Sequence, residues 1–304
     1  LFRTDIPADM AHSLPMDGSP TPLKPPPGAA ADWTIDQAWD SYGDQEHKVW
    51  TTLYERQVDL LGDRACAPFL RGLEALDLHG EGIPDFDRIN HELKRLTGWQ
   101  VVAVPGLVPD PVFFEHLANR RFPAGRFIRT PEQLDYLQEP DVFHDVFGHV
   151  PMLTDPVFAD YMAAYGRGGM RALSKGRLAH LARLYWHTVE FGLMRTDEGL
   201  RIYGAGIVSS RAESMFCLDD PSPHRLDFDL IRVMRTPYRI DDFQPTYFVI
   251  PSLEDLLAAS LQDFGPIYAE LDGLEDIAIG AVTPEDGVLH LGLQTYHQIC
   301  KADQ

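Results

Sequence analysis

The spacing of apolar residues along the chain predicts a mostly α-helical protein. Apolar side chains recur every three or four residues, which is the period of an α-helix. Nine segments show this pattern: one from Asp32 or Thr34 to Leu61, and others over 64–78, 85–97, 111–120, 140–147, 155–165, 175–195, 209–218 and 252–262. Local signals mark some of the ends, because Asp85 and Gly98 bracket one helix and Ser252 with Asp255 forms a capping box at the start of another.

Strand signals are few and short. Apolar or alternating runs predict strands over 99–104, 201–203 and 246–250, and a pair over 277–282 and 287–292. The glycine-rich run 166–169 is interpreted as a helix end and a loop. Strands do not alternate with helices in a βαβ series, and neither GxGxxG nor GxxxxGK[ST] occurs. The fold class predicted is therefore mostly α with a few short β-strands, without a Rossmann or P-loop nucleotide site.

The chain divides into a tail and one domain. Residues 1–31 contain seven prolines, which cannot donate to helix or sheet hydrogen bonds, and they are interpreted as a flexible tail. Residues 32–304 have the composition and the periodic apolar pattern of a single folded domain.

Charge and cysteine content narrow the functional classes. The 26 Lys and Arg against 46 Asp and Glu give a net charge of −20, which disfavours nucleic acid and anionic membrane surfaces as partners. No apolar run is long enough to cross a bilayer, and the first residues lack the pattern of a secretory signal. The three cysteines are far apart and outside any CxxC spacing, which is typical of a reducing compartment. We therefore expect a cytoplasmic protein.

The densest chemical signal is a pair of histidines in an apolar segment. His144 and His149 lie five residues apart between Val, Phe and Gly. On a regular α-helix this step of about 500° would point the two side chains some 140° apart. We expect Gly148 to break the helix between them so that they converge. Hydrogen-bonded core histidines remain an alternative.

A buried carboxylate completes a possible metal site. Glu190 is surrounded in sequence by Val, Phe, Gly and Leu, so it requires a cation, an arginine or a shifted pKa. His187, one turn earlier, is another candidate ligand. Two histidines and one carboxylate match the facial triad of non-haem iron(II) enzymes, but the same donors can hold catalytic zinc or a structural metal. The residues alone leave an oxygenase, a hydrolase and a non-catalytic metal-binding module open.

Four sequence blocks resemble one enzyme family. The strings PDVFHDVFGHVP, YWHTVEFGL, YGAGIVSS and DFQPTYFV occur in the order found in the pterin-dependent aromatic amino acid hydroxylases, and the resemblance spans about 35–295. It implies Fe(II) held by His144, His149 and Glu190, with tetrahydrobiopterin as the electron donor and O2 as co-substrate. His187 is not a ligand in the family pattern.

The resemblance also implies which residues surround the substrate and the pterin. Arg129 would bind the carboxylate of the amino acid with a planar fork. The other substrate residues implied are Pro140, Trp186, Phe191, Gly206, Ser209 and Ile240. The pterin residues implied are Gly106, Leu107, Phe113 and Tyr185, with Phe113 stacking on the cofactor. Asp145 stands where animal members of the family usually have glutamate, and it is implied to act next to the first metal ligand. Leu137 stands where the animal enzymes have a threonine near the substrate.

Substrate and assembly are expected from the same resemblance. Tyrosine hydroxylases have an acidic residue where this chain has Ile240, so the apolar side chain favours para-hydroxylation of L-phenylalanine to L-tyrosine; tyrosine and tryptophan hydroxylases are the alternatives. The tail is too short for a regulatory domain, and no long heptad helix follows the catalytic region. A monomer or weak dimer is therefore expected rather than a tetramer.

Overall fold

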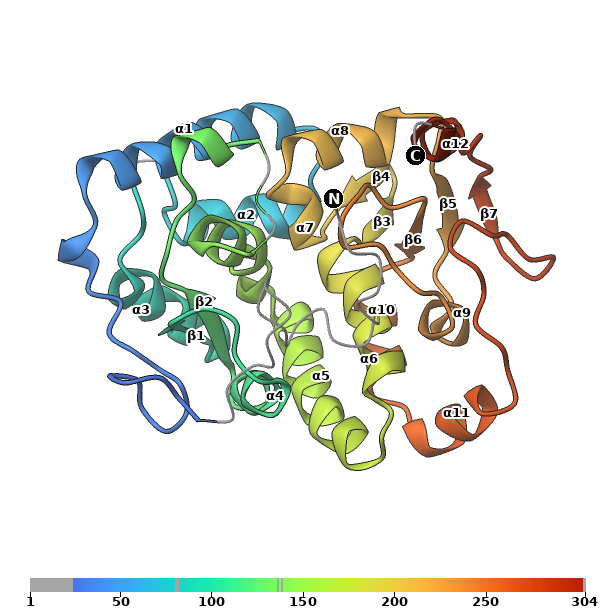
Figure 1. Cartoon of the computed structure of the whole chain (residues 1–304), viewed down its shortest axis with the longest axis horizontal. Coiled ribbons are helices and arrows are strands. Elements are labelled where there is room, and N and C mark those ends of the chain that lie inside the picture. The colour runs from blue at the N-terminus through green and yellow to red at the C-terminus, as the bar shows by residue number, and fades with distance from the viewer. Residues whose placement is uncertain (1–23, 80–81, 136, 138, 303–304) are drawn as a thin grey trace.

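Helices are the main secondary structure of the chain that the structure describes, as predicted. The structure is a computed structural model, and it describes residues 24–79, 82–135, 137 and 139–302 (Figure 1). The α-helices are α1 (Asp44–Leu61), α2 (Ala67–Ala75), α3 (Phe86–Thr97), α4 (Asp110–Ala118), α5 (Pro156–Ser174), α6 (Leu178–Tyr185), α7 (Ala205–Val208), α8 (Arg211–Asp219), α9 (Leu230–Met234), α10 (Leu253–Ser260), α11 (Phe264–Leu271) and α12 (Thr295–Ala302). Two π-helical segments, Phe143–His149 (η4) and Trp186–Glu190 (η6), interrupt this series.

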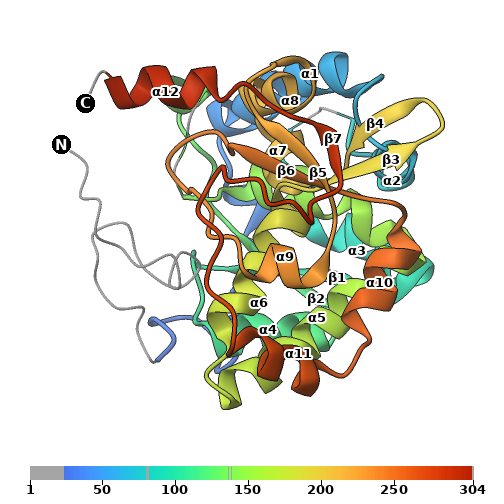
Figure 2. The ribbon, with the colours of Figure 1, turned by 90° about the vertical axis from the view of Figure 1, so that its right-hand side faces the viewer.

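The strands form two small sheets. A parallel pair joins β1 (Gln100–Val104) to β2 (Arg121–Gly125), with α4 as the crossover between them. The second sheet has the order β4-β3-β6-β5-β7, where the strands are β3 (Leu193–Thr196), β4 (Gly199–Ile202), β5 (His224–Asp227), β6 (Thr246–Ile250) and β7 (Val288–His290). Its three central strands are parallel and its two edge strands antiparallel. Figure 2 shows this sheet on one side of the molecule, with α5 and α6 below it.

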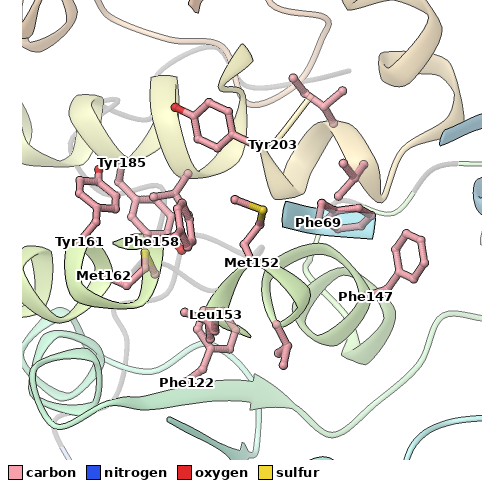
Figure 3. Packing of buried hydrophobic residues seen from close by; sticks show 14 of the residues in the cluster. Phe69, Phe122, Phe147, Met152, Leu153, Phe158, Tyr161, Met162, Tyr185 and Tyr203 are labelled. Atoms are coloured by element: carbon pink, nitrogen blue, oxygen red, sulfur yellow. The ribbon is translucent and has the colours of Figure 1, made fainter. Parts of the chain in front are cut away.

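The core is rich in aromatic rings and lies around α5. Phe158, Tyr161 and Met162 on α5 pack near Tyr185 at the end of α6, and Tyr203 approaches from the segment after β4 (Figure 3). Met152 and Leu153, from the short 3₁₀ turn Pro151–Thr154 (η5), connect this region to Phe69 and Phe147. The core is thus continuous from α2 to the β3–β7 sheet, and it includes residues of both π-helices.

Several predicted elements are confirmed with their caps. The side chain of Asp85 accepts a hydrogen bond from the Asp87 amide at the start of α3, and Gly98 ends that helix with φ of 75°, in the left-handed region. Ser252 accepts from the Asp255 amide at 3.1 Å at the start of α10. β1 and β6 also match their predicted ranges to within a residue.

The first predicted helix begins later than expected. Residues 34–38 are not helical, because the Ile35 amide donates to the Ala103 carbonyl beside β1 and Ala38 has a positive φ of 50°. Asp32 caps no helix; its carboxylate accepts from Thr34 and Arg121. Of the predicted tail, residues 1–23 lie outside the described residues, and 24–31 contain no helix or strand.

Other predictions were wrong. The run 166–169 is not a helix end but lies inside α5, where a glycine lets α5 approach α4. Segment 175–195 is not one helix: α6 passes into η6, which ends at Glu190, and the chain then enters β3. Segment 277–282 is not a strand. The described residues contain two βαβ units that were not predicted, β1-α4-β2 and β5-α9-β6. β2, β5, α9, α11 and α12 had no sequence prediction.

Candidate metal and substrate site

Two π-helices bring the predicted metal ligands together. A π-helix forms i→i+5 hydrogen bonds, so residues five apart lie about one turn apart. His144 and His149 begin and end such a stretch within η4, which is why they converge without the helix break that we expected at Gly148. Glu190 is the last residue of η6 and faces the same point. The predicted convergence of the two histidines is confirmed, but it results from the π-helix and not from a helix break.

The donor atoms of these three residues form a tight cluster. His144 Nε2 lies 3.3 Å from His149 Nε2, and the Glu190 carboxylate oxygens lie 3.6 Å and 3.1 Å from the two nitrogens. All three ligand atoms fall within 4.8 Å of one another. Burial lowers the pKa of His144 to about 4, so this imidazole is neutral near pH 7. Two imidazoles and a carboxylate on one face fit a divalent metal ion such as Fe(II).

A serine fixes which nitrogen of His144 faces this cluster. The Ser209 hydroxyl donates to the Ala205 carbonyl at 2.7 Å, so its oxygen accepts the Nδ1–H of His144 at 2.9 Å. The lone pair of His144 is therefore on Nε2, which points to His149 and Glu190. This is the tautomer that a metal ligand requires.

His187, the other candidate ligand, lies elsewhere. Its Nε2 donates to the Thr236 carbonyl at 3.0 Å, and its ring packs against Tyr238 and Phe248. Burial lowers its pKa to about 4, so it is a neutral core histidine. The structure removes it from the ligand set.

Arg129 is held by a partner that the sequence reasoning missed. The Asp141 carboxylate accepts from Arg129 Nε at 2.8 Å and from Nη2 at 2.9 Å. Asp141 is fully buried; burial opposes its ionisation, but the hydrogen bonds from Arg129 outweigh this and keep the pKa below its ordinary value. This pair leaves Nη1 of the guanidinium uninvolved. The only sequence signal for Asp141 is its place at the start of the histidine block.

One cavity gathers the predicted site residues. It has a volume of about 800 Å³, and the residues predicted to bind the metal, the substrate and the pterin all line its wall. The lining includes His144, His149, Glu190, Arg129, Pro140, Trp186, Phe191, Gly206, Ser209, Ile240, Gly106, Leu107, Phe113, Tyr185, Asp145 and Leu137. No predicted site residue is left outside it. A cavity of this size accommodates an aromatic amino acid together with a bicyclic cofactor.

Aromatic rings form two walls of the cavity. Trp186 and Phe191 lie with their ring centres 4.9 Å apart, and Tyr238 stacks on Trp186 at 4.3 Å. On another wall, Phe113 meets Tyr185 edge to face at 5.9 Å. The first group fits the ring of a substrate, and the second offers an aromatic face to a planar cofactor.

Two acidic side chains in the cavity wall titrate near neutrality. Burial raises the pKa of Asp145 to about 7, although the Gly125 amide donates to its carboxylate at 2.7 Å. Burial likewise raises the pKa of Glu213 to about 7; its carboxylate accepts from the Tyr247 hydroxyl. Glu213 was not predicted, because a glutamate in the first turn of a helix looks like an ordinary exposed residue.

The chain belongs to the biopterin-dependent aromatic amino acid hydroxylases, whose family model matches residues 37–267. The cavity with its facial triad agrees with this class.

Individual relatives are phenylalanine hydroxylases. The chain is 70% identical over 281 residues to phenylalanine-4-hydroxylase from Caulobacter vibrioides, covering 92% of this chain and 96% of that protein. An iron- and phenylalanine-bound crystal structure of phenylalanine hydroxylase from Chromobacterium violaceum matches with a TM-score of 0.82 at 54% identity, covering 88% of this chain and 96% of that one. A second structure of that enzyme, with iron(III) and 7,8-dihydrobiopterin, has a TM-score of 0.82 at 55% identity and covers 88% of this chain and 95% of that one.

None of the helices in the described ranges is both long enough and apolar enough to cross a bilayer.

Proposed function

We propose that the chain is a phenylalanine 4-monooxygenase that converts L-phenylalanine to L-tyrosine with O2, using Fe(II) and tetrahydrobiopterin. The observation that carries the proposal is the convergence of His144, His149 and Glu190 in a cavity that also holds a buried arginine and two aromatic walls. The iron- and phenylalanine-bound relative from Chromobacterium violaceum and the relative with 7,8-dihydrobiopterin support the choice of ligands.

The triad would hold the iron on one face. His144 and His149 each offer an Nε2 lone pair and Glu190 a carboxylate oxygen, which leaves the other coordination positions toward the cavity. Bound iron and the reduced pterin together supply the chemistry that activates O2. The chain itself fixes the tautomer of His144 through Ser209, and it buries the side chains of His149 and Glu190.

The substrate would lie between Arg129 and the Trp186 wall. Asp141 occupies the Nε edge of the guanidinium, so the Nη1 side is the one available for a substrate carboxylate. Trp186 and Phe191, with Pro140 and Gly206, form the slot for the ring. Ser209 would assist near the carboxylate.

Substrate selectivity would come from the apolar end of this slot. Ile240 lines the cavity and offers no hydrogen-bond partner to a phenol hydroxyl. We therefore expect good turnover of phenylalanine, poor turnover of tryptophan and the poorest turnover of tyrosine.

The pterin would lie against Phe113, with Gly106, Leu107 and Tyr185 around it. These four residues line the cavity, and Phe113 is only partly buried against the core. Asp145, close to the metal ligands, would act toward the pterin or its bound water.

The test measures iron content and activity in the same preparations. Alanine at His144, His149 or Glu190 should abolish iron retention and hydroxylation while the helical circular dichroism persists. His187→Gln is the matched control, since His187 is a buried histidine in the same π-helix as Glu190, but its Nε2 donates to the Thr236 carbonyl and it lies outside the ligand cluster. Full activity of the Glu190→Ala protein, or zinc retention without pterin-dependent O2 uptake by the wild type, would contradict the proposal.

Arg129 has its own test. Arg129→Ala should raise the KM for phenylalanine by orders of magnitude, because one partner of a buried ion pair with the substrate is lost. Arg129→Lys should also be impaired, since lysine cannot form the planar fork. An unchanged KM in both variants would place the substrate carboxylate elsewhere.

We also propose a single catalytic domain over 32–304 behind the tail 1–31, acting as a monomer or weak dimer in the cytoplasm. The continuous core supports one domain, and the net charge of −20 makes copies of the chain repel each other. Cys66 and Cys217 are buried free thiols, which agrees with a reducing compartment. Sedimentation showing a stable tetramer at micromolar concentration would contradict the assembly.

A further inference from the structure

A glutamine that does not touch the cavity binds two parts of its wall. Gln244 is buried, with 1% of its surface exposed, in the DFQPTYFV block just before β6. Its Oε1 accepts from the indole Nε1 of Trp186 at 3.2 Å. Its Nε2 donates to the Arg239 carbonyl at 2.7 Å and to the Asp242 carbonyl at 3.3 Å.

These contacts fix the orientation of the amide. The oxygen faces an N–H donor and the nitrogen faces two carbonyls, so the reversed amide would place like groups together on both sides. The backbone amide of Gln244 also donates to the Glu213 carboxylate at 3.4 Å, and Glu213 accepts from the Tyr247 hydroxyl. Gln244 is therefore held at its backbone and satisfied at its side chain.

The two parts that Gln244 joins both border the substrate slot. Trp186 forms one wall, with Tyr238 stacked behind it. The segment Arg239–Gln244, closed on itself by the Gln244 amide, carries Ile240 and Asp241 at the rim of the same cavity. A shift of the Gln244 side chain would therefore move the wall and the rim together.

We propose that Gln244 is a positioning residue that determines how narrowly the slot fits the ring of the amino acid. The inference rests on the proposed function, because it concerns the substrate of that site. Gln244 acts through the Trp186 indole on one side and through the Ile240 loop on the other. Without it, the Trp186 indole and the Arg239 amide each lose an acceptor, and the Arg239 and Asp242 carbonyls each lose a donor.

A volume-matched substitution separates this role from packing. Gln244→Met keeps the length of the side chain but can form none of its four hydrogen bonds. Gln37→Met is the control, because Gln37 is also buried and spans two backbone groups, the Pro84 carbonyl and the Phe86 amide, far from the cavity. If Gln244→Met does not fold, Gln244→Asn replaces it, since the shorter amide cannot reach both sides.

Binding to the iron(II)-loaded protein without pterin gives a readout that does not depend on turnover. Calorimetry with L-phenylalanine and L-tryptophan yields two dissociation constants for each variant. We expect Gln244→Met to weaken phenylalanine binding about tenfold, the effect of leaving one buried donor unpaired. Tryptophan binding should weaken less, so that the tryptophan-to-phenylalanine ratio of dissociation constants falls. Gln37→Met should leave that ratio unchanged.

A double-mutant cycle tests the link through the indole. Trp186→Phe removes the N–H that Gln244 accepts, so the effects of Trp186→Phe and Gln244→Met on phenylalanine binding should not multiply in the double variant. The inference is overturned if the two effects multiply in the double variant, or if Gln244→Met leaves the tryptophan-to-phenylalanine ratio of dissociation constants unchanged. It is also overturned if Gln37→Met changes that ratio equally. Wild-type protein that binds both amino acids but hydroxylates neither would refute the proposed function alone; one that binds neither would refute both.

Discussion

Replacing Asp141 by alanine removes the acceptor of four hydrogen bonds. The Asp141 carboxylate accepts from the Arg129 amide at 2.9 Å, from Nε and Nη2 of the same residue, and from the His144 amide at 3.0 Å. The carboxylate is fully buried and the Arg129 side chain is only 9% exposed, so water cannot replace the lost partner. The substitution therefore leaves a buried guanidinium without its counter-charge.

The expected cost is about 3–5 kcal/mol, which is typical of removing one partner of a buried ion pair. This is a large share of the roughly 5–15 kcal/mol by which domains are stable. Urea unfolding followed by circular dichroism measures it directly. Because Arg129 then lacks the group that orients it, phenylalanine binding by the folded fraction should also weaken.

Asp276→Ala is the matched control for Asp141→Ala. Asp276 pairs with the buried Arg183 in the same two-pronged way, at 2.6 Å and 2.7 Å, but its side chain is 50% exposed. Water can replace this carboxylate, so we expect a loss of about 1 kcal/mol and unchanged phenylalanine binding. The reasoning is refuted if Asp141→Ala is within 1 kcal/mol of the wild type or if the two variants lose equal stability.

Two further changes test packing and titration. Gly168→Ala should stabilise the protein by about 0.5–1 kcal/mol, since the new methyl group would make only ordinary van der Waals contacts. Gly166→Ala should destabilise it, because a Cβ there would lie 2.3 Å from the Ala118 amide nitrogen. Thermal unfolding of both variants measures the two effects. Burial raises the pKa of Glu213 from 4.5 to about 7, so the folded state holds this proton more tightly than the unfolded state does. As the pH rises from 4.5 to 7, the wild type should therefore lose roughly 3 kcal/mol of folding stability relative to Glu213→Gln. A pH-independent difference between those two proteins would exclude this titration.

The sequence predicted which residues meet in the cavity better than it predicted the boundaries of the helices and strands. The periodic helices and their caps were found because local signals such as Asp85 and Ser252 determine them. The interior position of 166–169 was missed because those glycines serve a crossing with α4, which no local pattern reveals. Short elements such as β5 and α9 depend on tertiary pairing rather than on their own residues.

Site residues were recognised from their chemistry and from the family blocks, but their supports were not. Asp141 and Gln244 lie outside the cavity lining, and each is hydrogen-bonded to a residue that lines it, Arg129 and Trp186 respectively. Their partners are 12 and 58 residues away in sequence, so spacing gives no hint of the contact. Only the folded arrangement shows that a buried carboxylate and a buried amide are needed there.

The two π-helices explain how an unfavourable spacing becomes a site. His144 and His149 would point apart on an α-helix, and the extra residue per turn in η4 removes that angle without ending the helix. The same spacing occurs at η6. Tyr185 precedes this π-helix, Glu190 is its last residue, and these two residues, five apart, line the same cavity. A helix break would have left flexible backbone between the ligands, whereas a π-helix keeps it hydrogen-bonded and buried. Two ligand-type residues five apart in an apolar helical segment are therefore compatible with a π-helix as well as with a helix break.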